Sequence, residues 1–208
     1  MIINIGRQIG SGGHEVGKRR EGALNYKFYD REILQKATEE SGISTELFEQ
    51  ADERTLGAQT ASWFGSRLNI WGNSGTPFAN GLTNESLFQI QSEAIRQLAR
   101  QGNCIFIGRC ADYILRDRTD CLNVFISANK PDRIRRIMKQ LHIDQKQAVS
   151  LIEKTDKQRA AYYNFYTDMQ WGCAESYDLC FNSSTFGIDL IVRILSEWVS
   201  RKSQITYS

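Results

Sequence analysis

The sequence predicts an α/β fold in which helices cover both faces of a five-stranded parallel sheet. Two observations support this prediction: short apolar segments rich in β-branched residues recur along the chain, and segments with apolar residues at helical spacing separate them. Strands that are apolar throughout are typical of parallel sheets, which are buried on both faces. The predicted strands are residues 1–6, 26–30, 103–107, 121–128 and 177–183. The length of 208 residues suits one such domain with a small insert.

Helices are predicted in the segments between these strands. The first follows a glycine-rich turn and covers 14–24, although Gly17 and Gly22 weaken it by about 1 kcal/mol each. Asp30 is placed to cap the second, at 31–42. The remaining predicted helices cover 44–56, 84–102, 111–115, 130–142, 144–168 and 186–202. The alternation of strand and helix therefore extends over nearly the whole chain.

Residues 57–84 interrupt this alternation. Glycine, serine and asparagine are interleaved there with aromatic residues, a composition typical of an inserted segment or of a loop over a site. The aromatic residues fit either the lining of a base-binding pocket or a contact between two copies of the chain, and the sequence does not distinguish these alternatives. They are Trp63, Phe64, Trp71 and Phe78.

The composition points away from several classes of protein. There are 26 Lys and Arg residues against 24 Asp and Glu, and no block of like charge, so neither nucleic acid nor a membrane is indicated as a partner. No apolar run approaches the roughly 18 residues of a membrane span, and residues 1–5 lack the basic start of a signal peptide. Five cysteines without CxxC spacing, beside only two histidines, favour reduced, mostly buried thiols over a zinc site. We therefore expect a cytoplasmic protein.

The glycine-rich turn after the first predicted strand is the main candidate for a binding site. Four of its eight positions are glycine, namely Gly6, Gly10, Gly12 and Gly13, and Ser11 lies among them. A turn of this kind presents backbone amides at a helix N-terminus, at the edge of the sheet where ligands bind, and such amides favour phosphate. The alternative is a tight connection without a ligand. The density of glycine favours the phosphate site.

Six segments in order carry a resemblance to the cytidylate kinase-like family, a branch of the P-loop nucleoside monophosphate kinases. They are IGRQIGSGGHEVGK (5–18), YKFYDREIL (26–34), FIGRCADYIL (106–115), NVFISANKPDRIRRI (123–137), EKTDKQRAAYYNFYT (153–167) and YDLCFNSSTFGID (177–189). Only 55–90, approximately, has no counterpart. The resemblance implies a single three-layer P-loop kinase domain over 1–208, with a mostly helical acceptor-side insert at about 42–90 and a lid region at 133–172.

The same resemblance implies an activity. The chain is expected to use ATP and Mg²⁺ to transfer a phosphoryl group to a small acceptor, foremost a nucleoside monophosphate such as CMP, which gives the diphosphate. Two alternatives stay open: a nucleotide-binding, catalytically weak module derived from a kinase, and a kinase of a non-nucleotide acceptor. A homo-oligomer is compatible with the sequence, and no metal-ligand set is assigned.

The glycine-rich loop departs from the ordinary cytidylate kinase pattern. The GSG of the family is retained, but the position of the loop lysine is Gly13, and His14 and Glu15 occupy the neighbourhood of the Mg²⁺-binding Ser or Thr. His14 is either close to the phosphates or without a special role, and Glu15 either reaches Mg²⁺ through water or simply favours the helix dipole. The nucleotide phosphate site implied by the resemblance comprises Gly10, Ser11, Gly12, Gly13, His14 and Glu15.

Without the lysine, positive charge must come from elsewhere, because phosphoryl transfer depends on positioning and on cations around the transferred group. By resemblance, Arg133 and Arg136 begin the helix that carries the lid, and Arg159 ends the Asp-x-x-Arg motif of its returning arm. These three are the predicted catalytic phosphate clamps. The alternative is an ordinary solvated helix face.

The acceptor side is predicted from two further motifs. By resemblance, Arg109 binds the phosphate of the acceptor, a role that suits the bidentate guanidinium, whereas a capping or ion-pairing arginine is the alternative. Asp30 and Arg31 end the second strand, and the resemblance implies that this region faces the acceptor. Arg31 would then bind the acceptor phosphate and Asp30 would orient an acceptor group or a water on Mg²⁺, although Asp30 equally fits a helix cap. The aromatic residues within 162–166 are expected to pack against the core rather than stack on a base.

Overall fold

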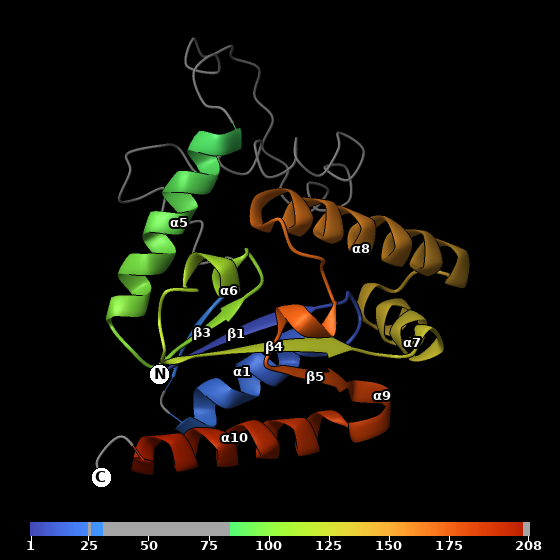
Figure 1. Ribbon diagram of the computed structural model, residues 1–208. Helices are drawn as coiled ribbons and strands as arrows, with labels where there is room; N and C mark the ends of the chain where they lie inside the picture. The colour runs from blue at the N-terminus through green and yellow to red at the C-terminus, as the bar shows by residue number, and fades with distance from the viewer. Residues whose placement is uncertain (25, 31–83, 206–208) are drawn as a thin grey trace, which may run out of the picture. The chain divides into compact units, whose positions relative to one another are not determined.

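The computed structural model describes residues 1–24, 26–30 and 84–205, which form a five-stranded sheet (Figure 1). The strands are β1 (Ile2–Arg7), β2 (Lys27–Tyr29), β3 (Cys104–Ile107), β4 (Cys121–Ser127) and β5 (Leu179–Asn182). Their order is β2-β3-β1-β4-β5, and all four ladders are parallel. The predicted parallel sheet is therefore confirmed, with β1 at its centre.

Helices lie on both faces of this sheet. Figure 1 shows α1 and α10 below the sheet and α8 above it, and α1 packs against α10. The described helices are α1 (Gly13–Leu24), α5 (Asn84–Arg100), α6 (Ala111–Ile114), α7 (Lys130–Leu141), α8 (Gln145–Thr167), α9 (Ser183–Phe186) and α10 (Ile188–Ile205), with a 3₁₀ turn η2 (Ala174–Ser176). The sequence did not predict η2 or α9, which have three and four residues.

The main core lies between the sheet and α10. Ile5 of β1 and Val124 of β4 are almost completely buried, as their uniformly apolar strands predict. Three residues of α10 at spacings of four, Ile191, Leu195 and Val199, close the core from the helix side. Burial of each such side chain stabilises the fold by about 1.5–3 kcal/mol.

A second apolar cluster ties the pair α7 and α8 to the glycine-rich loop. Ile137 and Ile152 are buried where the two helices meet, and Ile9 of the loop packs against them. The start of α8 is fixed by a capping box, in which Asp144 and Gln147 each bond the backbone of the other. The loop is therefore anchored by apolar packing as well as by hydrogen bonds.

The chain folds into two compact units, one formed by 1–30 with 96–208 and the other by 31–95. The predicted helices at 31–42 and 44–56, and the aromatic residues of segment 57–84, lie outside the described residues. The same holds for the predicted insert at 42–90, apart from the first turns of α5. The predicted lid region at 133–172 comprises most of α7, all of α8 and the turn after it.

Two expectations from composition can be compared with the structure. All five cysteines are free thiols; Cys104 and Cys110 are buried, whereas Cys180 is exposed. The thiols are thus unpaired as expected, but they are not all interior. Among the described helices, none has the length and apolar character needed to cross a bilayer.

Candidate active site

The glycine-rich loop lies between the end of β1 at Arg7 and the start of α1 at Gly13. This is the carboxyl edge of the central strand, where open α/β sheets bind their ligands. Gly10 and Gly12 have φ angles of 73° and 82°, in the left-handed region that costs other residues about 1–2 kcal/mol. A Cβ on Gly10 would also lie 2.9 Å from the backbone carbonyl oxygen of Arg133. The loop conformation therefore depends on these two glycines.

The three arginines predicted to clamp phosphate all donate hydrogen bonds to backbone carbonyls in and next to this loop. The pairs are Arg159 Nη1 with the carbonyl oxygen of Arg7 at 3.1 Å, Arg133 Nε with that of Ile9 at 2.8 Å, and Arg136 Nη1 with that of Gly10 at 3.1 Å. The Ser183 hydroxyl donates to the carbonyl of Ser11 at 2.6 Å and accepts from Arg136 Nη1 at 3.0 Å. Side chains from α7, α8 and α9 thus hold the loop by its carbonyls.

These bonds set the direction of the loop amides. In a trans peptide, the carbonyl of one residue points away from the amide of the next. Because the carbonyls of Ile9 and Ser11 are bound, the amides of Gly10 and Gly12 face the opposite side, and no described residue accepts a hydrogen bond from either. The first turn of α1 adds amides without intrahelical partners, where the helix dipole favours an anion. The loop can therefore bind phosphate through its backbone.

Arg133 and Asp156 form an ion pair behind the loop, with 7% and 17% of their side chains exposed. Asp156 Oδ1 accepts a hydrogen bond from the amide of Ile9 at 3.0 Å, while Arg133 binds the carbonyl of the same residue. Two of the three side-chain nitrogens of Arg133 are thus engaged with the protein itself. The structure places Arg133 as a support of the loop backbone.

A cluster of positive charge lies at the carboxyl ends of β1 and β3. Burial lowers the pKa of Arg7 to about 9, with the charges of Arg159 and Arg109 acting in the same direction and Asp30 opposing them. Burial also lowers the pKa of Arg159, although Asp156 and Asp30 oppose this shift. Arginine keeps its charge at neutral pH in such a setting. Like charges held together away from water are stabilised by an added anion, which makes the cluster suitable for phosphate.

Asp30 links β2 to the start of α1. Its Oδ1 lies 3.6 Å from Arg7 Nη2, and its Oδ2 lies 3.3 Å from His14 Nε2. The ring of His14 also contacts Phe28 edge-on, with 5.2 Å between the ring centroids. Asp30 is thus at the site, beside one predicted phosphate-loop residue. Its predicted role as a helix cap concerns residues outside the described part of the chain, where Arg31 also lies.

Arg109 stands on an unusual piece of backbone. Gly108, Arg109 and Cys110 have φ angles of 70°, 62° and 55° directly after β3. Left-handed backbone in non-glycine residues costs about 1–3 kcal/mol each, and such strain gathers at functional sites. Arg109 lies close enough to Arg7 and Arg159 for its positive charge to contribute to the lowering of the pKa of both. The placement agrees with a site at the end of β3.

The sequence model of the cytidylate kinase-like family matches residues 2–185, which is most of the chain and includes every site residue described above. The chain belongs to the cytidylate kinase-like family. Membership in this family supports phosphoryl transfer as the general class of reaction. It leaves the acceptor open.

Solved structures share the fold of this chain. An uncharacterized protein from Eubacterium ventriosum is 26% identical, with 96% of this chain and 98% of that chain covered and a TM-score of 0.69. Shikimate kinase from Bacteroides thetaiotaomicron is 15% identical, with the same coverage and a TM-score of 0.51, a likeness that concerns the fold alone. No curated protein is significantly similar in sequence.

The remaining predicted residues of this cytidylate kinase-like chain make their contacts elsewhere or lie on the surface. Glu15 pairs with Arg19 one turn later on α1, and Arg19 also pairs with Asp189 of α10, so Glu15 belongs to a surface network. Within the aromatic segment 162–166, Tyr163 is buried as predicted. Phe165 is 71% exposed, so the prediction of core packing is wrong for this residue, which lies on the outer side of α8.

Sequence reasoning missed three residues that build the site: Arg7, Asp156 and Ser183. Asp156 and Ser183 lie within motifs that carried the family resemblance, but their hydrogen bonds to the loop span 147 and 172 residues and have no local pattern. Arg7 did carry a signal. It precedes the lysine position by six residues, where the P-loop pattern has its first glycine.

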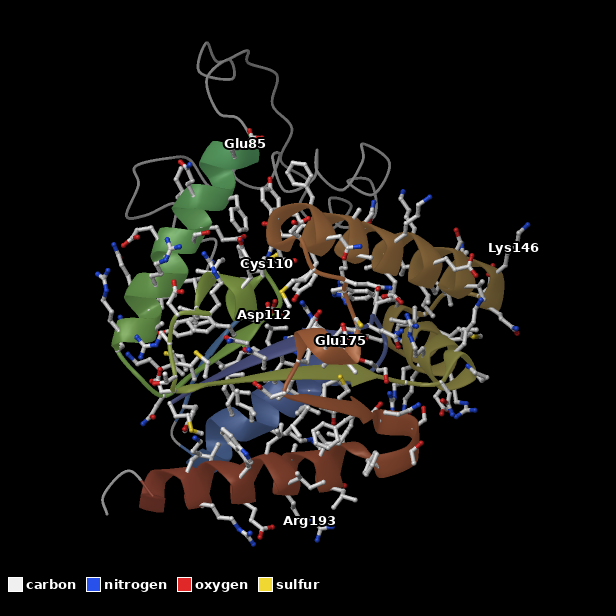
Figure 2. All side chains as sticks on the ribbon, in the orientation of Figure 1. Glu85, Cys110, Asp112, Lys146, Glu175 and Arg193 are labelled. Atoms are coloured by element: carbon white, nitrogen blue, oxygen red, sulfur yellow. The ribbon has the colours of Figure 1, made fainter. Side chains whose placement is uncertain are left out.

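A partly buried acid lies beneath α8, where Figure 2 labels Asp112 and Cys110. The Tyr163 hydroxyl donates a hydrogen bond to Asp112 Oδ2 at 2.6 Å. Burial raises the pKa of Asp112, and the bond from Tyr163 opposes this shift. The nearby carboxylate also adds to the rise that burial causes in the pKa of the Tyr163 hydroxyl. No sequence pattern indicates this pair, because its residues are 51 positions apart.

Proposed function

We propose that this protein transfers the γ-phosphoryl group of ATP to a small acceptor, with a nucleoside monophosphate of the CMP type as the first candidate. One observation carries the proposal: the amides of the glycine-rich loop and the guanidinium groups of Arg109 and Arg159 converge at the carboxyl edge of the central strands. Phosphoryl transfer is catalysed mainly by such positioning and by positive charge. Family membership supports the same class of reaction.

The residues of the site divide into three roles under this proposal. The amides of the loop bind the phosphates of ATP, and Arg133 and Arg136 keep the loop in shape through its carbonyls. Arg159 stabilises the charge on the transferred group, since its half-buried guanidinium lies beside the loop. Arg109 binds the phosphate of the acceptor.

Mg²⁺ fits the same site. Among the described residues, no group of three or more His, Cys, Asp or Glu side chains could hold a metal ion. Mg²⁺ needs no such group, because it is usually held by phosphate oxygens, water and one or two carboxylates. Asp30 is the carboxylate in a position to contribute. When bound, Mg²⁺ would offset the negative charge of the triphosphate.

The absence of the loop lysine favours a second candidate, a nucleotide-binding module with weak catalysis. A Cβ on Gly13 would lie 2.6 Å from Arg7 Cβ, so the position has no room for the usual lysine. A protein of this kind would bind ATP but transfer its phosphoryl group slowly or not at all.

A coupled assay for ADP release distinguishes the candidates. Purified protein is tested with MgATP and a panel of CMP, dCMP, UMP, AMP and non-nucleotide alcohols and acids, beside Arg159→Gln and the matched surface variant Arg135→Gln. Turnover with CMP that Arg159→Gln abolishes and Arg135→Gln retains supports the proposal. Turnover with a non-nucleotide acceptor alone would replace CMP by that acceptor, and ATP binding without transfer to any compound would support the binding module.

A further inference from the structure

The loop of this chain differs from the P-loop pattern at two positions that are related to each other. In G-x-x-x-x-G-K-[ST], the lysine follows the first glycine by six residues. Gly13 stands at the lysine position, and Arg7 therefore stands at the position of the first glycine. Relative to the P-loop pattern, the glycine and the long cationic residue have therefore exchanged positions 7 and 13.

The structure explains why the two departures occur together. A Cβ built on Gly13 would lie 2.6 Å from Arg7 Cβ and 3.1 Å from Arg7 Cγ. The Cβ of Arg7 is fixed by the backbone and stays in this place in every rotamer. The side chain of Arg7 thus starts where a side chain at position 13 would start. An arginine at position 7 and a lysine at position 13 therefore exclude each other.

The other end of the Arg7 side chain lies toward β2 and β3. A Cβ on Gly108 would lie 2.0 Å from Arg7 Nη1, so the missing side chain of Gly108 leaves room for the guanidinium. Arg7 Nη2 lies 3.6 Å from Asp30 Oδ1. Gly13 accommodates the base of Arg7 and Gly108 its charged end, which places the guanidinium beside Asp30.

The charge of Arg7 is only partly balanced in this position. Its side chain is 18% exposed, and the 3.6 Å separation from Asp30 is longer than a direct hydrogen bond. Arg159 and Arg109 bring further positive charge close to it. A guanidinium in these surroundings can bind two phosphate oxygens at once.

We propose that Arg7 replaces the ammonium of the P-loop lysine and binds the terminal phosphates of the nucleotide. Arg7 and Gly13 act as one unit, in which the glycine provides the space that the arginine occupies. The inference rests on the proposed function for the identity of the nucleotide, but the site itself is defined by affinity for a chain of phosphates.

Isothermal titration of the full chain with MgATP and, separately, with inorganic tripolyphosphate tests the proposal. Arg7→Gln should weaken both affinities by about tenfold or more, since it removes a charge-assisted contact. Arg7→Lys should retain more affinity than Arg7→Gln. Arg135→Gln, whose side chain is 77% exposed, should bind as the wild type does. Wild-type affinity for tripolyphosphate in a folded Arg7→Gln protein would overturn the proposal.

Restoring the ordinary residues at both positions 7 and 13 is the more stringent test. Gly13→Lys alone should lower Tm, because its Cβ meets that of Arg7, and Arg7→Gly alone should lose tripolyphosphate affinity. Together, Arg7→Gly and Gly13→Lys restore the ordinary pattern, and should recover both Tm and affinity relative to the single variants. A double variant no better than Gly13→Lys would refute the exchange. If the protein transfers no phosphoryl group but its binding of tripolyphosphate depends on Arg7, the proposed role of Arg7 in phosphate binding is supported and the kinase function is rejected.

Discussion

Arg133 and Asp156 pair with each other and bind the two backbone polar groups of a single loop residue. Arg133 donates to the carbonyl of Ile9, and Asp156 accepts from its amide. Because α7 contributes the arginine and α8 the acid, the ion pair fastens two helices and the loop at one point. The conformation of the loop therefore depends on side chains more than 120 residues away.

The first prediction concerns this pair. Arg133→Met and Asp156→Asn should each lower the free energy of unfolding by about 3–5 kcal/mol, because each leaves a buried charge without its partner. The double variant should lose less than the sum of the two, since no unpaired charge is left. Urea denaturation of the wild type, both single variants and the double variant measures this coupling, and strictly additive losses would contradict it.

Arg159 allows a test that separates function from stability. Arg159→Gln should reduce turnover on the order of a hundredfold or more, because a charge next to the transferred group is lost. Its Tm should change little. Loss of the hydrogen bond to the carbonyl of Arg7 and of the attraction to Asp156 and Asp30 is offset because a charged group no longer has to be buried beside Arg109 and Arg133. Kinetics and thermal melts of the same preparations, with Arg135→Gln as control, give both values. A large fall in Tm would reassign Arg159 to a structural role.

The elements were predictable where local pattern determines them. The central strands are apolar throughout, so β1 and β4 were predicted almost to the residue. The last helix was less accurate: one helix was predicted from residue 186, whereas α9 ends at Phe186 and α10 starts at Ile188. Gly187, with a φ of 70°, separates the two. Periodicity does not reveal that break, because its cause is a backbone conformation.

The site was predictable only where it depends on local sequence spacing. The glycines at positions 10 and 12 are identified by their spacing, and the structure shows why each needs its left-handed φ. The contacts of Arg7 are different, because its neighbours Asp30, Gly108 and Arg159 come from three other segments. A sequence pattern identifies the departure at position 7 but not the space that Gly13 leaves for it.

The glycines of the loop can be compared with a glycine elsewhere. Gly10 and Gly102 have φ angles of 73° and 70°, but a Cβ on Gly10 would lie 2.9 Å from a backbone oxygen, whereas one on Gly102 would meet nothing within 4 Å. Gly102→Ala should therefore cost only the conformational strain of about 1–2 kcal/mol. Gly10→Ala should cost more and should also weaken binding of MgATP. Chemical denaturation and titration of both variants measure this, and equal losses of stability would contradict it.

The last prediction follows from the raised pKa of Asp112. Because the folded state disfavours the charged carboxylate, this group contributes most to stability below the pKa of the unfolded chain, and the contribution is lost as the pH rises through the higher folded value. Asp112→Asn should therefore be more stable than the wild type at neutral pH, with Tyr163 still able to donate its hydrogen bond to the amide oxygen. The advantage should shrink as the pH falls into the acid range. Thermal melts from pH 4 to 8, with the exposed Asp117→Asn as control, measure this difference; a constant gap between Asp112→Asn and the wild type would show that the charge of Asp112 does not matter.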